Sequence, residues 1–227
     1  HVERLTRQDA AQKQFIADMA HELKTPMTSM IGYADLLRRT SVDEAQRQQA
    51  LGAIVQQGER LERMGQKLLR LSGLDQGDAL SLAEHKASDL FAQAAQAVDG
   101  LRAAQGITIV QQAGIFGWRC NGDLMITLMQ NLLSNAIRAS RPGSRVWLTA
   151  RRDGLSVRDE GIGIPPEHLP HVTEAFYMVD KSRTRAAQGA GLGLALCRRI
   201  AQLHDARLTI QSQPGQGTTV DVAFTSL

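Results

Sequence analysis

Hydrophobic residues in the first 75 positions recur with the spacing of two amphipathic helices. In the first helix, apolar residues follow one another at steps of three, four or seven: Phe15, Met19, Leu23, Met30, Ala34 and Leu37. In the second they keep close to a seven-residue repeat: Leu51, Ile54, Gly58, Leu61, Met64 or Gly65, Leu68 and Leu71. The pattern predicts two helices separated at 40–43, with Thr40 or Ser41 capping the second.

The short connection makes the two helices antiparallel neighbours. A single hairpin of this kind cannot bury both apolar stripes, whereas two copies packed as a four-helix bundle can, so we expect a homodimer. Pro26 lies inside the first helix. Because proline lacks an N–H and crowds the carbonyl of Glu22, we expect it to interrupt and kink that helix.

The segment after 73 changes pattern and predicts a second domain. Residues 74–78 are rich in turn formers and read as a linker between a helical hairpin at 1–73 and a domain at 79–227. The pattern there predicts strands at 79–84, 107–111, 115–119, 145–151, 155–158, 206–212 and 218–224, and helices at 87–104, 121–139 and 192–203. Consecutive strands are expected to pair as three hairpins. Since strands and helices mix without strict alternation, we expect an α/β sandwich, a mixed sheet with helices on one face.

Composition narrows the class of protein. The 227 residues are 43% hydrophobic and carry a formal charge of only +3, which does not favour a nucleic-acid binder. The two cysteines, Cys120 and Cys197, have neither zinc nor disulfide-framework spacing. No run approaches the roughly 18 apolar residues of a membrane span. Because the chain starts at His1 within a helical pattern, we expect it to be a fragment with its upstream part missing.

One histidine lies on the polar side of the first helix. At about 100° per residue, His21 points opposite the midpoint of Met19 and Leu23, so it faces water. Asp18 shares that surface and Glu22 is its immediate neighbour. An exposed imidazole between carboxylates is a candidate nucleophile, and the same pattern suits an ordinary surface histidine.

Two asparagines in the second domain are four residues apart. Asn131 and Asn135 therefore share one face of the helix predicted at 121–139, with Arg138 nearby. Amide oxygens are ligands for a hard cation such as Mg²⁺, which also binds phosphates. Two polar residues on the wet side of an amphipathic helix would look the same.

Two glycine-containing segments follow. Asp159 comes directly after a predicted strand, and its carboxylate can accept a hydrogen bond from an exocyclic amine. Gly161 and Gly163 let the backbone approach the flat ring that carries this amine. The glycine run 189–194 leads into a helix, where free N–H groups favour phosphate. An ordinary glycine turn is the alternative for either segment.

The stretch 165–188 is long and has no clear regular pattern, as in loops that act as lids. Its basic residues Lys181, Arg183 and Arg185 would neutralise a triphosphate, or form a solvated surface.

Taken together, these motifs resemble the cytoplasmic catalytic core of a sensor histidine kinase. The H box is 21–26, the N box 131–135, the first glycine box 159–163, the F box 174–177 and the second glycine box 189–194, in the family's order. The resemblance implies a dimerising phosphotransfer hairpin followed by a Bergerat-type ATP-binding domain of the gyrase, Hsp90, histidine kinase and MutL superfamily.

The resemblance also implies residue roles. His21 would be the phosphoacceptor, Glu22 the acid that orients or deprotonates it, and Thr25 the residue that places a water for the reverse, phosphatase reaction. Asn135, helped by Asn131, would hold Mg²⁺. The adenine amine would be recognised by Asp159, with Gly161 and Gly163 around the base. Further nucleotide or lid contacts would be Arg138, Tyr177, Lys181, Arg183, Arg185, Gly189, Ala190, Gly191, Leu192 and Gly193.

The chain departs from the family at several positions. Glu160 stands where asparagine is frequent, Met178 where arginine is common and Ala190 where threonine is frequent. Thr127 lies where the ATP-hydrolysing relatives place a catalytic glutamate, which favours transfer to histidine over hydrolysis.

The resemblance therefore implies ATP-dependent phosphorylation of His21 and transfer to an aspartate on the receiver domain of a response regulator. It implies a cytoplasmic core, with any membrane anchor upstream. Two alternatives remain: an ATPase conformational clamp of the same superfamily, and a non-catalytic dimeric scaffold.

Overall fold

The computed structural model describes residues 2–73, 80–179 and 191–225. It forms two compact units, His1–Arg70 and Leu71–Leu227. The predicted linker at 74–78 lies outside the described residues. In the described part of the chain, no helix is both long and apolar enough to cross a membrane.

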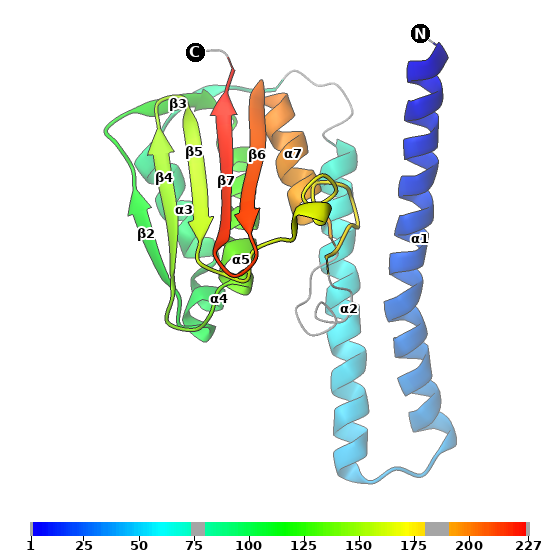
Figure 1. The fold of residues 1–227 in the computed structure, drawn as a ribbon. Coiled ribbons are helices and arrows are strands. Elements are labelled where there is room, and N and C mark those ends of the chain that lie inside the picture. Colours follow the sequence, from blue (N-terminus) through cyan, green and yellow to red (C-terminus); the bar gives the residue numbers. More distant parts are fainter. Residues whose placement is uncertain (1, 74–79, 180–190, 226–227) are drawn as a thin grey trace. The chain divides into compact units, whose positions relative to one another are not determined.

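The first unit is the predicted helical hairpin. Helix α1 spans Val2–Arg39 and α2 spans Glu44–Gly73, and the two run in opposite directions (Figure 1). The predicted cap is wrong: the Asp43 side chain accepts the N–H of Gln46, whose side chain accepts the N–H of Asp43 in return. This reciprocal capping box uses the residue next to the helix, because Thr40 and Ser41 lie too far from its first turn.

Helix α1 runs through Pro26 without a break, so the predicted interruption is wrong. Proline removes one backbone hydrogen bond, but the remaining turns of this 38-residue helix hold on both sides. The proline ring is buried, and its packing opposes the loss.

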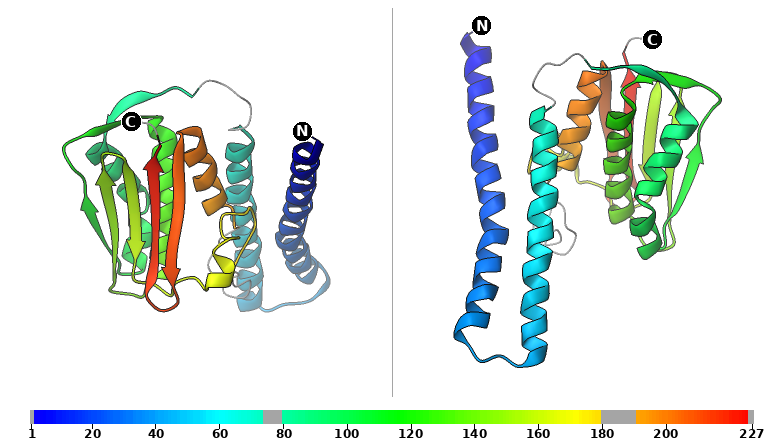
Figure 2. Two further views of the ribbon diagram at one scale, coloured as in Figure 1. Left: turned by 45° about the horizontal axis from the view of Figure 1, so that its top comes forward. Right: turned by 180° about the vertical axis from the view of Figure 1, so that it is seen from behind.

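The second unit is the predicted α/β sandwich. Its main sheet has the order β2-β4-β5-β7-β6, in which β2 and β4 are parallel and the other pairs antiparallel. The strands are β2 Thr108–Gln112, β4 Arg145–Arg151, β5 Gly154–Asp159, β6 Ala206–Gln213 and β7 Gly217–Phe224. Helices α3 Ala87–Ala97, α5 Gly122–Ala139 and α7 Gly193–Leu203 cover one face of this sheet (Figure 2).

Two details of the predicted topology are wrong. The segments near 107–119 do not form a hairpin, since β2 pairs with β4 and β3 (Gly117–Cys120) pairs with β1 (Ala83–Lys86). The helix expected at 87–104 is divided at Val98 into α3 and α4 (Asp99–Ala104). The predicted hairpins β4–β5 and β6–β7 are confirmed.

The core lies between the sheet and helix α5. The buried side of α5 carries Met125, Leu128, Met129, Leu132, Leu133, Ala136 and Ile137. These residues form one cluster with buried residues of β4, β5 and β7, among them Leu148, Val157 and Val222. Packing of this face fixes α5 on the sheet and leaves its opposite side free for polar chemistry.

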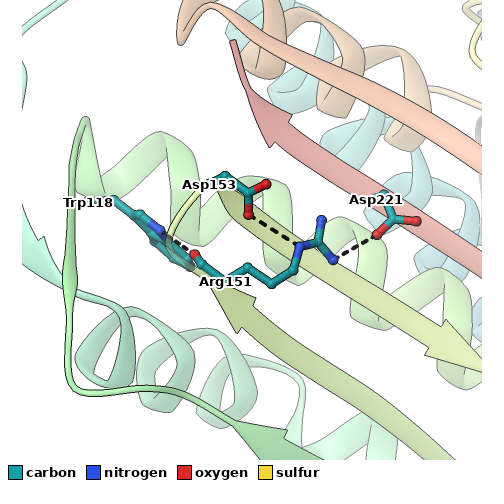
Figure 3. A network of polar contacts seen from close by, with 4 residues as sticks. All are labelled: Trp118, Arg151, Asp153 and Asp221. Carbon is teal, nitrogen blue, oxygen red and sulfur yellow. Dashed lines mark hydrogen bonds and ion pairs between the residues drawn. The ribbon is translucent and has the colours of Figure 1, made fainter. Parts of the chain in front are cut away.

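Arg151, the last residue of β4, connects neighbouring strands through polar contacts. Its guanidinium contacts Asp221 at 3.1 Å and Asp153 at 3.4 Å, and its carbonyl accepts the indole N–H of Trp118 at 2.9 Å (Figure 3). The network joins β3, β4 and β7 and satisfies the N–H of a buried tryptophan.

Candidate functional site

A cavity of about 480 Å³ opens beside helix α5 in the second unit. Its volume is in the range of small-molecule sites. The lining residues are mostly apolar: Leu132, Asn135, Ala136, Ala139, Val157, Asp159, Ile162, Gly163, Ile164, Pro165, Val179, Leu194, Ile210, Pro214, Thr218 and Val220. The polar side chains in this wall are few, so each one restricts which ligand fits.

Asp159 is the acidic residue in this wall and is only 5% exposed. Its Oδ1 accepts the backbone N–H groups of Gly161 at 2.8 Å and Thr218 at 3.2 Å. Burial raises the pKa of this carboxyl, and the two backbone donors oppose that rise. Among the described residues no hydrogen bond ends on Oδ2, which leaves one oxygen to accept an amine from a ligand.

The two glycines after Asp159 meet protein backbone. A Cβ on Gly161 would lie 2.3 Å from the Ala139 carbonyl oxygen, and one on Gly163, whose φ is +68°, would lie 2.0 Å from that of Gln213. The absence of side chains lets the loop press against the end of α5 and the β6–β7 turn, and Gly163 lines the cavity. The expected approach of this loop to a flat ring stays a prediction.

The predicted pair of asparagines lies on one face of α5. Asn131 donates its side-chain N–H to the Thr127 carbonyl at 2.8 Å, which fixes the orientation of its amide. Asn135 is exposed and lines the cavity. A Cβ on Gly193 would lie 3.3 Å from Asn131 Oδ1 and 3.8 Å from Asn135 Oδ1. The start of α7 therefore lies over both amides.

This arrangement suits a cation shared with phosphate. Among the described residues no group of three or more His, Cys, Asp or Glu side chains could hold a metal. The two amide oxygens would need ligand oxygens to complete a Mg²⁺ shell, and the first N–H groups of α7 are available to an anion there. Arg138 is exposed one turn beyond Asn135.

The F box and the second glycine box meet at their backbones. The N–H of Phe176 donates to the Gly191 carbonyl at 3.0 Å, and a Cβ on Gly191 would lie 2.7 Å from the carbonyl carbon of Phe176. Phe176 has a φ of 65° and is buried, while Leu192 next to the glycine is fully buried. The start of α7 is thus anchored on the F box.

Tyr177 is not among the residues that line the cavity, although we expected it there. Its hydroxyl is 2.6 Å from His168 Nδ1, and its ring lies near those of His168 and His171. Five other expected residues lie outside the described part of the chain: Lys181, Arg183, Arg185, Gly189 and Ala190.

In the first unit, His21 is exposed on α1 as predicted. Thr25 is exposed one turn later and donates its hydroxyl to the His21 carbonyl at 3.3 Å. Glu22 is half-buried, and its Oε2 lies 3.8 Å from Nη2 of Arg60 on α2. Sequence reasoning missed Arg60, because the repeat does not place it on the apolar stripe and its partner lies on the other helix.

Comparisons with known proteins agree with this architecture. Residues 11–77 match the His Kinase A (phospho-acceptor) domain, and residues 120–226 match the histidine kinase-, DNA gyrase B- and HSP90-like ATPase domain. The chain is 34% identical over 218 residues to the sensor histidine kinase YkoH of Bacillus subtilis, covering 94% of this chain and 47% of YkoH. It is 32% identical over 228 residues to the sensor protein SrrB of Staphylococcus aureus, covering 93% of this chain and 37% of SrrB.

A solved structure shares the fold. The histidine kinase ThkA in complex with response regulator protein TrrA aligns over 96% of this chain and 63% of that chain, with 16% identity and a TM-score of 0.77. The chain thus consists of a phospho-acceptor helical hairpin followed by an ATPase-type domain. The chain belongs to the sensor histidine kinases and spans about half the length, or less, of the curated relatives named above.

Proposed function

We propose that this core binds ATP in the second unit and transfers the γ-phosphoryl group to His21, from which it passes to an aspartate of a response regulator. Residues 1–73 would serve as the dimerising phosphotransfer domain, 74–78 as the linker and 79–227 as the catalytic domain. The single observation that carries the proposal is buried Asp159, held through one oxygen in the wall of an apolar cavity that Asn135 also lines.

The cavity suits an adenine base. Its apolar walls can pack against the faces of the ring, and the second oxygen of Asp159 can accept a hydrogen bond from the exocyclic amine. The triphosphate would then run toward Asn135, Asn131 and the first N–H groups of α7. When bound, Mg²⁺ would be held by Asn135 and Asn131 and would neutralise phosphate charge.

His21 is suited to attack because it is exposed and because the neutral form of an imidazole has a free lone pair on one ring nitrogen. An imidazole nitrogen bonds to the γ-phosphorus while the bond to the β–γ bridging oxygen breaks and ADP leaves. The proton on the other ring nitrogen passes to a base, a role that we assign to Glu22. The product is a phosphoramidate, and its phosphoryl group can then be transferred to a receiver aspartate.

The surface of the hairpin supports a homodimer. Ile31 is 62% exposed and Val55 is 60% exposed, so apolar side chains of both helices remain uncovered in one chain. Further exposed apolar residues of the hairpin are Ile16, Met27, Leu36, Leu51 and Leu69. A second copy would cover such a surface in a four-helix bundle. Sedimentation velocity should give a dimer mass.

The response regulator is the partner that the chemistry requires, since a phosphohistidine needs an acceptor. The histidine kinase ThkA, which shares this fold, forms a complex with the response regulator protein TrrA. We assign Thr25 to the reverse reaction, in which its exposed hydroxyl would place a water against the phosphorylated regulator.

We infer a cytoplasmic location for this core and an anchor upstream of it. The small net charge gives no support for nucleic-acid binding.

Incubation with γ-labelled ATP separates the proposed kinase from the two alternatives. We expect label on the protein that is stable in alkali and lost in acid, that needs Mg²⁺, and that disappears in His21→Gln. Thr28→Ala, on the same exposed side of α1 two turns later, is the matched control and should keep its label. Free phosphate without labelled protein would indicate an ATPase clamp, and no turnover at all would indicate a scaffold.

A further inference from the structure

An ion pair crosses the hairpin next to His21. Glu22 of α1 and Arg60 of α2 approach to 3.8 Å, and their side chains are 17% and 15% exposed. The other ion pairs among the described residues of the hairpin join residues three or four apart on one helix, and they are more exposed. The pair is therefore the polar connection that ties the position after the histidine to the second helix.

The direction of Glu22 separates it from the imidazole. Adjacent residues on a helix point about 100° apart and do not face each other. The carboxylate is turned toward α2, and among the described residues no hydrogen bond joins it to the His21 ring. In this arrangement Glu22 cannot take the imidazole proton that phosphorylation releases.

The pair is also built to open at low cost. At 3.8 Å the two groups lack a short hydrogen bond, and the Nε of Arg60 is buried without a partner among the described residues. A pair at this separation lacks the short charge-assisted hydrogen bonds that make such contacts strong. A contact of this kind holds a side chain in place without locking it.

We propose that Arg60 is a positioning residue that withholds the Glu22 carboxylate from His21, so that phosphorylation of His21 proceeds only when this pair opens. The inference rests on the proposed kinase function and adds a control element to it. Opening lets Glu22 rotate to the imidazole, take the proton from the ring nitrogen that does not bond to phosphorus, and so complete the transfer. Any movement of α2 relative to α1 would change how often this happens.

The neighbouring Arg63 provides a matched control. It lies almost one turn later on α2, and its Nε and Nη2 are likewise buried without partners among the described residues. Its ion pair is with Glu59 of the same helix at 3.5 Å, and among the described residues no ion pair joins it to α1. A general effect of removing a half-buried guanidinium should appear in both variants, whereas a positioning effect should appear only in the Arg60 variants.

The test measures the initial rate of His21 labelling from γ-labelled ATP in the complete chain. We expect Arg60→Gln and Arg60→Met to raise this rate about fivefold with an unchanged KM for ATP, Arg60→Lys to stay near wild type, and Arg63→Gln to have no effect. Arg60→Met keeps the apolar stem of the side chain and so guards against loss of folding, which circular dichroism checks.

A double-mutant cycle makes the test specific. In a Glu22→Gln background, which has no carboxylate to release, Arg60→Gln should no longer raise the rate. A lower rate in a folded Arg60→Met variant, or the same rise in the presence and absence of the Glu22 carboxylate, would overturn the inference. Failure of the kinase proposal is distinct, because wild type itself would then carry no label on His21.

Discussion

The carboxylate of Asp159 accepts the backbone N–H of Thr218, a residue 59 positions later in the chain, at 3.2 Å. This bond links the last residue of β5 to the start of β7 and helps to fix the carboxylate in the cavity wall. The same oxygen accepts the N–H of Gly161 at 2.8 Å. The backbone thus saturates one oxygen of the buried acid and keeps the other for a ligand.

Replacement of Asp159 should separate binding from stability. In Asp159→Asn the side-chain oxygen can still accept both N–H groups, but the second acceptor becomes a donor. We expect ATP affinity, measured by calorimetry, to fall at least about tenfold, since losing one good hydrogen bond to a charged group costs about 1.5–3 kcal/mol. The control Glu167→Gln, an exposed residue, should bind ATP normally.

The pKa of Asp159 adds a pH signature. Because the folded state raises this pKa, the folded protein holds the proton more tightly than the unfolded chain. The contribution of Asp159 to the stability of the empty domain should therefore rise as the pH falls through the folded-state pKa toward 3.8. Thermal unfolding of wild type and Asp159→Asn across this range should converge at low pH. Parallel curves would contradict the assigned shift.

Gly163 should be intolerant of any side chain. Gly163→Ala combines a φ of +68° with a Cβ 2.0 Å from the Gln213 carbonyl oxygen, so we expect a loss of about 3 kcal/mol and weaker ATP binding. Gly143→Ala is the matched control, because its φ is +83° but nothing lies within 4 Å. It should cost about 1 kcal/mol and leave ATP binding unchanged. Equal losses in urea unfolding would argue against the close backbone contact.

His204 should make the second unit acid-sensitive. Its Nδ1–H donates to the Ile200 carbonyl at 2.8 Å, and its Nε2 accepts the N–H of Asn121 at 3.0 Å. Burial lowers the pKa of this histidine, so the folded state favours the neutral ring. Stability should fall as the pH drops below the unfolded value of about 6.5, until the folded-state pKa is passed.

Tryptophan fluorescence can measure this, since Trp118 and Trp147 both lie in the second unit. In urea unfolding, wild type should lose more stability between pH 7.5 and 5.5 than His204→Gln does. If His204→Gln kept the wild-type pH dependence, another group would be responsible.

Replacement of Thr25 should slow only the dephosphorylation of the response regulator. Its hydroxyl is exposed one turn from His21, and its bond to the His21 carbonyl does not involve the imidazole. We expect Thr25→Ala to label His21 at the wild-type rate but to dephosphorylate a receiver domain at least about tenfold more slowly. Thr25→Ser, which keeps the hydroxyl, should restore most of that rate. An equal loss of both activities would mean that Thr25 supports the helix rather than a water.

Local patterns predicted the elements well, because each depends on residues close in sequence. Apolar spacing alone indicated both helices of the hairpin, and alternation indicated the β4–β5 and β6–β7 hairpins. The pairing of β2 with β4 was missed because it joins segments separated by a whole helix, and no local signal encodes such a register.

The candidate site shows the same division. His21, Asn131, Asn135 and Asp159 carry chemistry that a short motif can indicate. Thr218 and Arg60 were missed because each acts through a partner far away in sequence, and neither residue type is unusual on its own element. The glycines were identified, but their neighbours were not: only the fold shows that Gly161 and Gly163 meet the backbone of Ala139 and Gln213.

The central claim is that a nucleotide site in the second unit phosphorylates one imidazole in the first. It is tested most directly by incubating the chain with ATP and Mg²⁺, digesting it at mildly alkaline pH and locating the phosphoryl group by peptide mass spectrometry. At an ATP concentration below the wild-type Kd, we predict an added phosphate on His21 in wild type and at least about tenfold less modified peptide in Asp159→Asn. A phosphate on a serine, threonine or other histidine, or a modified His21 in the Asp159 variant at the wild-type level, would contradict the account.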